Sequence, residues 1–254
     1  GWMDRDCVCW LFYCANLAMA ACLLFALAWK CRSLPAWLQA AVMAVLSTLY
    51  FRSAIRTTSL GNYGILIAFL LVVFCRALER KADVLAGLCW AVMMVKPHVA
   101  VLLAWPLLYA KRYKTIATAV AVCICATLFP SYLYGKGPWE LIMEIPRIGA
   151  PYLMQDTSWA PVTVRLGRRI FGDFNIAVCA ALGFTVCGVL CGYVRDCREW
   201  WMKALPVALV VPFWTYSQSI DYIARWNVAL AATGIVFGLL PFPASRRSRL
   251  CSSL

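Results

Sequence analysis

One lysine interrupts a long apolar stretch and is followed by a proline and by the single histidine of the chain. Residues 90–101 read Trp-Ala-Val-Met-Met-Val-Lys-Pro-His-Val-Ala-Val, so Lys96 and His98 have apolar sequence on both sides. Charged groups at membrane depth are costly and usually serve a function, and a proline frees backbone carbonyls that can line a cavity. An ammonium group there suits a lipid phosphate. A hairpin tip whose lysine reaches the outer surface explains the same residues equally well.

A second polar segment, residues 52–63, is rich in arginine and hydroxyl side chains. The guanidinium of Arg56 can hold a phosphate through two parallel hydrogen bonds. Asn62 follows Gly61, a pair that favours a tight turn, so we expect an outer connection that ends where the next helix begins. Ordinary anchoring of helix ends at the membrane interface is the simpler explanation of the charges.

Two later segments also carry polar groups of the kinds that bind sugars. Residues 134–173 combine aromatic and acidic side chains, including Asp156 and Trp159. Aromatic rings stack on the apolar face of a sugar, and carboxylates accept hydrogen bonds from its hydroxyls. Asp221 and Arg225 stand four residues apart, so on a helix they share a face and can neutralise each other. Lipid-headgroup contacts and structural pairing are the alternatives.

The amino-acid composition indicates the class of protein to which these residues belong. Hydrophobic residues make up 64% of the 254 residues, charged residues 14%, and the mean hydropathy is +0.76. Soluble domains average near half apolar and a quarter charged, so a single soluble domain is excluded. The net charge of +13 sits in short clusters between apolar runs, which argues against a nucleic-acid-binding face. The pattern is typical of a multi-span membrane protein.

Most of the 14 cysteines lie inside these apolar runs. We therefore interpret them as small hydrophobic residues rather than as a disulfide framework. With one histidine in the chain, a conventional zinc ligand set is missing, and no metal site is predicted.

Apolar runs predict nine membrane spans when the Lys-Pro-His interruption is counted as dividing one run into two half-length pieces. A helix needs about 20 apolar residues to cross a membrane, and fewer where it is broken. Residues 134–173 form a long outer loop between the fifth and sixth runs. The apolar runs are 8–29, 34–51, 63–75, the broken 84–110, 115–133, 174–194, 204–216 and 222–240.

Five basic clusters fall on one side of the membrane if these spans alternate. By the positive-inside rule that side is cytoplasmic. The same alternation places the polar segments around residues 52–62, 96–98, 134–173 and 217–221 on the outer face. The clusters are Lys30/Arg32, Arg76/Arg80/Lys81, Lys111/Arg112/Lys114, Arg195/Arg198/Lys203 and Arg246/Arg247/Arg249.

Several motifs follow one another in a fixed order. A Gly-Asn turn opens a helix in residues 60–67, an Ala-Gly helix occupies 86–92, Lys-Pro follows at 95–98, and a basic cluster closes at 109–114. This order and spacing resemble glycosyltransferase family 87. The segments Asp-Thr-Ser-Trp at 156–159 and Ser-Ile-Asp-Tyr at 219–222 are shorter matches to the family's outer loop and late polar turn.

The resemblance implies an all-α, polytopic transmembrane helical bundle of the lipid-donor glycosyltransferase type. It implies transfer of a hexose, mannose in the family's best-known members, from a polyprenyl-phosphate donor to an extracytoplasmic lipid or glycan acceptor, in the plasma (inner) membrane. Neither a cofactor nor nucleic acid is implied. In this reading Lys96, Arg56 and Arg225 bind the donor phosphate, and the substrate contacts are His98, Asn62, Asp221, Trp159 and Asp156.

Family members usually carry an additional first span and a first outer loop with the acidic residue that acts as base. This chain opens on Gly1, after the place where both are expected. We therefore interpret residues 1–254 as one integral membrane domain of an N-terminally truncated member, and no catalytic base is assigned.

Two other classes of protein stay open at this stage. A transporter or lipid flippase also uses broken helices with an intramembrane lysine. Such proteins carry broken segments at matching positions in two halves, which this sequence does not show. A non-catalytic membrane scaffold would account for the missing acidic loop but not for the polar clusters on one face.

Overall fold

The computed structural model describes residues 5–59, 64–95, 100–141, 143 and 176–214, and these residues form helices joined by short turns without any strand. Their buried side chains form a single apolar core that receives residues from every long helix. The all-α prediction is confirmed for this part of the chain. The Arg246/Arg247/Arg249 cluster and the predicted span 222–240 lie outside the described residues.

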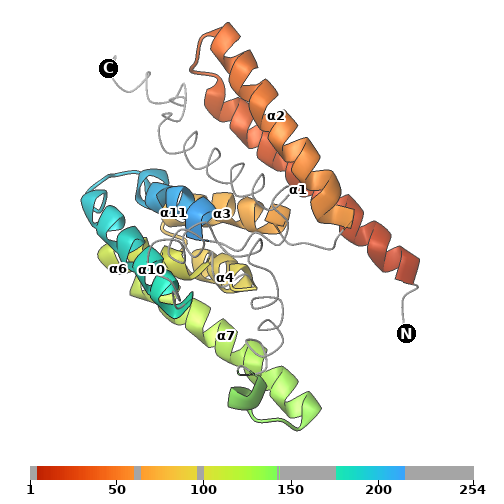
Figure 1. Ribbon diagram of the computed structural model, residues 1–254, viewed down its shortest axis with the longest axis vertical. Coiled ribbons are helices and arrows are strands. Elements are labelled where there is room, and N and C mark those ends of the chain that lie inside the picture. The colour runs from red at the N-terminus through yellow and green to blue at the C-terminus, as the bar shows by residue number, and fades with distance from the viewer. Residues whose placement is uncertain (1–4, 60–63, 96–99, 142, 144–175, 215–254) are drawn as a thin grey trace, which may run out of the picture.

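Helices α1 (Arg5–Cys31) and α2 (Ala36–Ser59) lie side by side as an antiparallel pair (Figure 1). The prediction that residues 52–59 form a connection was wrong, because α2 continues to Ser59. No glycine or proline interrupts residues 36–60, and hydroxyl side chains can be satisfied within a helix. Thr48, for example, donates to the Ala44 carbonyl at 2.8 Å. The hydroxyl-rich composition therefore did not end the helix.

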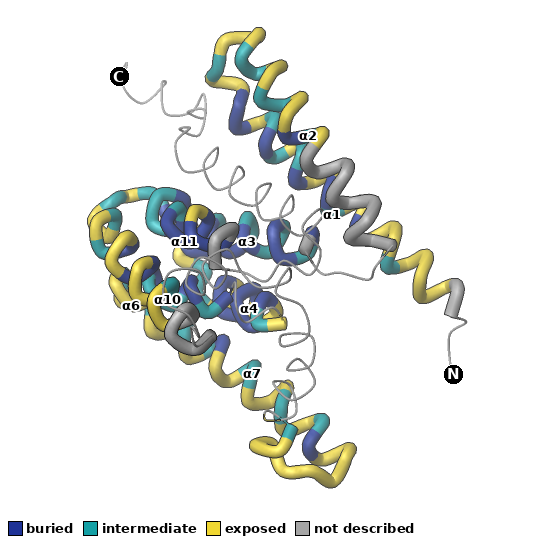
Figure 2. The backbone as a smooth tube through the Cα atoms, viewed as in Figure 1, coloured by how far each residue is buried: buried dark blue, intermediate teal, exposed yellow. Residues whose placement is uncertain are grey.

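Helices α3 (Gly64–Glu79) and α11 (Trp200–Trp214) contribute much of the buried core. Figure 2 shows this concentration of buried residues on α3, α4 and α11, with exposed residues along α1, α7 and α10. Phe74, Leu78, Trp201 and Val211 are essentially inaccessible to solvent. Helix α11 begins four residues before the predicted start of its span.

The Lys-Pro interruption separates two short helical arms, as predicted. The first arm is α4 (Asp83–Met93), and the second is the 3-10 turn η1 (Val101–Leu103) followed by α6 (Ala104–Tyr109). At about 1.5 Å per residue α4 is roughly 16 Å long, half the thickness of a membrane core. Residues 84–110 therefore do not form one straight helix.

Helix α7 (Tyr113–Tyr134) follows directly and is roughly twice as long as α4. It ends at Gly135, whose φ of 63° reverses the chain in the left-handed region that suits glycine. Helix α10 (Ile176–Tyr193) agrees closely with the predicted span 174–194.

Two of the described helices are long and apolar enough to cross a membrane, at Cys7–Cys31 and Tyr113–Tyr134. Four shorter apolar helical stretches accompany them: Ala36–Thr48, Asp83–Met93, Ala181–Tyr193 and Trp200–Val211. These helices are compatible with membrane association.

Candidate active site at the broken hairpin

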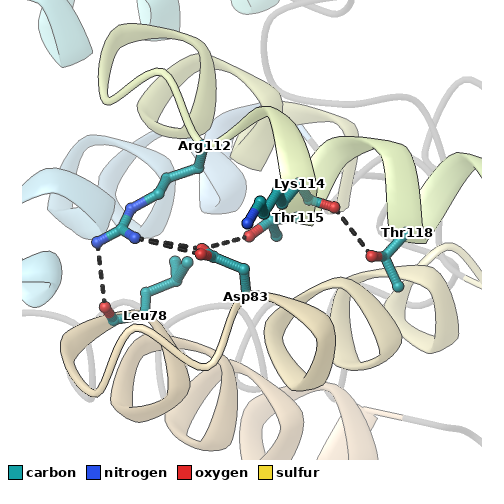
Figure 3. A network of polar contacts seen from close by, with 6 residues as sticks. All are labelled: Leu78, Asp83, Arg112, Lys114, Thr115 and Thr118. Carbon is teal, nitrogen blue, oxygen red and sulfur yellow. Dashed lines mark hydrogen bonds and ion pairs between the residues drawn. The ribbon is translucent and has the colours of Figure 1, made fainter.

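A network around Asp83 joins the two ends of the broken hairpin (Figure 3). Arg112, just after α6, approaches the Asp83 carboxylate to 3.2 Å and donates to the Leu78 carbonyl at 3.4 Å. Thr115 in the first turn of α7 donates to the same carboxylate at 3.0 Å. Asp83 opens α4 and Arg112 follows α6, so the first arm begins where the second arm ends. The described residues that end the first arm and begin the second, Met94 and Ala100, mark the opposite tip.

The same end of the helices collects charges from three further elements. Lys30 of α1 is fully buried and interacts electrostatically with the carboxylates of Glu199 and Glu79. Two cations lie near the Trp200 ring, with the Arg112 guanidinium 5.5 Å and the Lys203 ammonium 5.2 Å from its centroid. We call this region, defined by Lys30, Glu79, Asp83, Arg112 and Glu199, the charged end.

Four of the five predicted basic clusters thus come together in space. They are the clusters that contain Lys30, Arg76, Arg112 and Lys203. Lys30 interacts electrostatically with Arg76 and with two carboxylates, and Arg112 and Lys203 both lie near the Trp200 ring.

The first arm is held along its length by α7. Gly87 lies so close to α7 that an added Cβ would stand 2.6 Å from the Thr118 Cβ and 2.8 Å from the Thr115 carbonyl oxygen. Only glycine permits this approach of the two helices. Because α4 and α7 both begin at the charged end, the first arm runs along the N-terminal half of α7.

The second arm is held by α10 through two hydrogen bonds to its backbone. The Trp105 indole donates to the Phe184 carbonyl at 2.9 Å, and the Tyr109 hydroxyl donates to the Gly188 carbonyl at 3.2 Å. The Trp105 ring also packs on Phe184, with 4.9 Å between ring centroids. The first arm therefore packs on α7 and the second arm on α10.

Trp90 closes the hairpin near its tip. Its indole N–H donates a buried hydrogen bond of 2.8 Å to the Ala100 carbonyl. This bond joins the last turn of α4 to the start of the second arm, across residues 96–99 of the sequence, which lie outside the described residues. Described residues thus fix both ends of the Lys-Pro-His segment.

Replacing Trp90 by phenylalanine should lower the free energy of unfolding by about 1 kcal/mol, since the buried Ala100 carbonyl loses its donor while most of the ring remains. Thermal unfolding in detergent, followed by circular dichroism, measures the change. Trp37→Phe is the matched control, because that indole is 73% exposed. Equal stability of the two variants would contradict a structural role for the Trp90 bond.

An apolar groove of about 360 Å³ runs between the first arm and α7. It is lined by Trp90 and Met94 on one side, by α7 residues between Ala119 and Leu128 on the other, and by Pro138 beyond the end of α7. Met94, at the end of the first arm, therefore lies beside the middle of α7.

Most predicted site residues lie outside the part of the chain that the structure describes. Arg56 lies in the helical part of α2, but its side chain is not described. The residues outside the described ranges are Lys96, His98, Asn62, Asp156, Trp159, Asp221 and Arg225.

Sequence reasoning missed the residues that hold the hairpin. Asp83, Gly87 and Trp90 recur at spacings of four and three, which places an acid, a glycine and an indole on one helix face. Trp105 and Tyr109 likewise stand four apart. These spacings indicate a packing face, although the partner helices cannot be read from them.

The order of elements agrees with the motif order that suggested a family. The family model of glycosyltransferase family 87 matches residues 1–217, most of the chain. The chain belongs to glycosyltransferase family 87. Comparison with curated proteins and with solved structures gave no match. Membership makes the chain a glycosyltransferase, which uses a sugar donor and an acceptor.

A family 87 glycosyltransferase transfers sugar to a hydroxyl, which releases a proton, and a carboxylate near the reacting atoms can accept that proton. Among side chains that the structure describes, Glu79, Asp83, Asp196 and Glu199 lie at or beside the charged end. Glu140 lies beyond the other end of α7 and accepts a hydrogen bond from the Gly137 N–H at 3.0 Å. The hairpin tip points away from the four carboxylates and toward the opposite end of α7.

Proposed function

We propose that this glycosyltransferase is a multi-pass protein of the plasma (inner) membrane that transfers a hexose, mannose, from a polyprenyl-phosphate donor to an extracytoplasmic lipid or glycan acceptor. The charged end faces the cytoplasm, in keeping with the positive-inside rule. The reaction then takes place on the outer side, where the Lys-Pro-His segment and the predicted outer loop belong.

The observation that carries this proposal is the construction of the broken hairpin. Asp83 and Arg112 join its base, Gly87 and Trp105 fix its arms, and Trp90 joins its last turns. This frame supports the proposal that Lys96, between the two arms in the sequence, is held in a fixed position. Rigid placement of a cation is what stabilisation of a departing phosphate requires.

In the proposed step, the bond between the sugar C1 and the lipid-phosphate oxygen breaks, and the electron pair stays on the phosphate. The acceptor hydroxyl oxygen bonds to C1 and gives its proton to a carboxylate base. Lys96, assisted by Arg56 and Arg225, holds the phosphate and offsets its growing charge. Asn62, His98, Asp156, Trp159 and Asp221 contact the sugar or the acceptor.

Lys96→Ala should lower sugar transfer by roughly tenfold or more, because the phosphate loses its cation. Membranes containing the protein are supplied with polyprenyl phosphate carrying labelled mannose, and transfer and donor binding are both measured. Lys96→Arg should keep part of the activity, since it retains the charge.

Lys114→Ala is the matched control for this experiment, because Lys114 is an exposed lysine near the charged end. We expect it to transfer sugar at the unmodified rate. Absence of both transfer and donor binding in the unmodified protein would refute the lipid-donor function. Equal losses in Lys96→Ala and Lys114→Ala would refute the role of Lys96.

A further inference from the structure

The chain turns in the same way at two places of the charged end, between α3 and α4 and between α6 and α7. Each turn is centred on a lysine in the left-handed region, with φ of 59° at Lys81 and 54° at Lys111. In each turn the lysine N–H bonds to the carbonyl three residues earlier, and the next N–H bonds to the carbonyl five residues earlier. Helices commonly end in this way, but with glycine at the left-handed position.

A lysine at this position destabilises the turn relative to glycine, because its Cβ crowds the following carbonyl oxygen. Among the residues that the structure describes, Lys81 and Lys111 are the only non-glycine residues with a positive φ. Residues held in such conformations cluster at functional sites. The backbone favours glycine at both turns, so a role for the two lysines lies in their side chains.

The two turns are in direct contact. Asp83 stands two residues after Lys81. Lys111 directly precedes Arg112, whose guanidinium lies 3.2 Å from the Asp83 carboxylate. Arg112 also donates to the carbonyl of Leu78, which belongs to the first turn (Figure 3). The two lysines, both exposed, therefore flank a single ion pair.

Positive charge remains unbalanced at these two turns. The four described carboxylates of this end already face cations: three form ion pairs with arginine, and the fourth interacts with the buried ammonium of Lys30. The ammonium groups of Lys81 and Lys111 form no ion pair with a described residue. They are thus available to an anion from outside the chain. The four carboxylates belong to Glu79, Asp83, Asp196 and Glu199.

Exposed apolar side chains next to both lysines indicate what kind of anion fits. They begin three residues after Lys81 in α4, and they occupy the last turn of α6 and the first residue of α7, on both sides of Lys111. In a membrane such side chains contact acyl chains while a neighbouring lysine reaches the headgroup phosphate. A free phosphate or a nucleic acid would leave them without a partner. These side chains are Val84, Leu85, Leu88, Leu108, Tyr109 and Tyr113.

We propose that Lys81 and Lys111 together bind the headgroup phosphate of an anionic phospholipid in the leaflet that contacts the charged end. The acyl chains of this lipid lie along the exposed residues of α4, α6 and α7. The site is separate from the proposed sugar transfer, because it lies at the end of the hairpin opposite Met94 and Ala100 and requires only that the chain lies in a membrane. Under the proposed function this leaflet is the cytoplasmic one.

Photocrosslinking tests the location. The full chain is placed in phosphatidylcholine nanodiscs with a trace of phosphatidylglycerol that carries a diazirine on an acyl chain, and labelled peptides are identified by mass spectrometry. We expect labels at residues 84–88 and 108–113 that unlabelled phosphatidylglycerol removes and that phosphatidylethanolamine and inorganic phosphate leave in place. Labels confined to other peptides, or equal displacement by phosphatidylethanolamine or by inorganic phosphate, would overturn the proposal.

Glycine substitution at both turns separates the charge from the backbone. Lys81→Gly with Lys111→Gly removes two ammonium groups and relieves the left-handed backbone, so we expect a higher unfolding temperature and labelling lowered roughly tenfold. Lys81→Arg with Lys111→Arg should keep most of the labelling, because the charge is retained. A glycine variant that keeps its labelling, or that loses stability together with it, would contradict the proposal.

The matched control removes the same charge from the two other turns of this end. Arg32, between α1 and α2, and Arg198, between α10 and α11, are exposed, and neither has a positive φ. Arg32→Ala with Arg198→Ala should leave labelling within about twofold of the unmodified protein, since salt screens charges that do not touch the headgroup. Equal losses in this control and in the glycine variant would refute a site at the two lysines.

The outcomes distinguish this site from the proposed function. Displaceable labels at the two turns of a protein that transfers no sugar would retain the site and refute the function. Sugar transfer by a protein whose labels phosphatidylglycerol does not displace would refute the site and leave the function intact.

Discussion

Replacing Gly188 by alanine is expected to destabilise the protein by about 3 kcal/mol, because overpacking and the loss of two hydrogen bonds add together. The new Cβ would lie 2.6 Å from Cε2 and 2.8 Å from Cζ2 of Trp105. The indole cannot retreat without losing its bond to the Phe184 carbonyl, and displacement of α6 would also break the bond from Tyr109. Chemical unfolding in detergent measures the loss.

Gly192 provides the matched control one turn further along α10. A Cβ there would meet the Tyr109 hydroxyl oxygen at 3.4 Å, which is ordinary van der Waals contact. Gly192→Ala should therefore be neutral or stabilise the helix by about 0.5 kcal/mol through propensity. Opposite signs for the two substitutions support the contact between α6 and α10. The same sign and size for both would show that helix propensity alone decides the outcome.

Asp83→Ala should lower the free energy of unfolding by about 2 kcal/mol, since it leaves Arg112 and Thr115 without their shared acceptor. The Asp83 and Arg112 side chains are 20% and 24% exposed, so solvent reduces the cost below that of a fully buried pair. The hairpin base should open as a result. We therefore expect faster amide hydrogen exchange in α4 and α6 than in α3.

A double-mutant cycle isolates the ion pair from other effects of the substitution. Asp83→Ala and Arg112→Ala together should cost less than the sum of the two single changes. Asp196→Ala is the control, because Asp196 is 88% exposed in its pair with Arg195 at 3.2 Å and such pairs contribute little. Additive losses at Asp83 and Arg112, or an equal loss at Asp196, would contradict the proposed role of the network.

The sequence predicted the α-helical class, the break at Lys-Pro and the limits of α7 and α10 to within a few residues. Apolar run length and charge spacing carry that information, since α7 begins beside Lys111 and Arg112 and ends at Gly135, and α10 ends just before Arg195. The prediction was wrong at α2, where eight residues assigned to a connection are helical. Polar composition alone does not end a helix that contains no glycine or proline.

The sequence alone also determined the family, through short motifs that occur along the chain in the order typical of that family. It singled out Lys96 as an unusual cation, and the roles of Lys96 and the other predicted site residues stay predictions. What only the tertiary structure decided is how the hairpin is held: Arg112 lies 29 positions from Asp83, and Trp105 lies 79 positions from Phe184. Contacts between residues so far apart depend on which helices pack together, and helix packing is decided by the shapes of complete surfaces. A groove between α4 and α7 arises in the same way, because neither helix contains it alone.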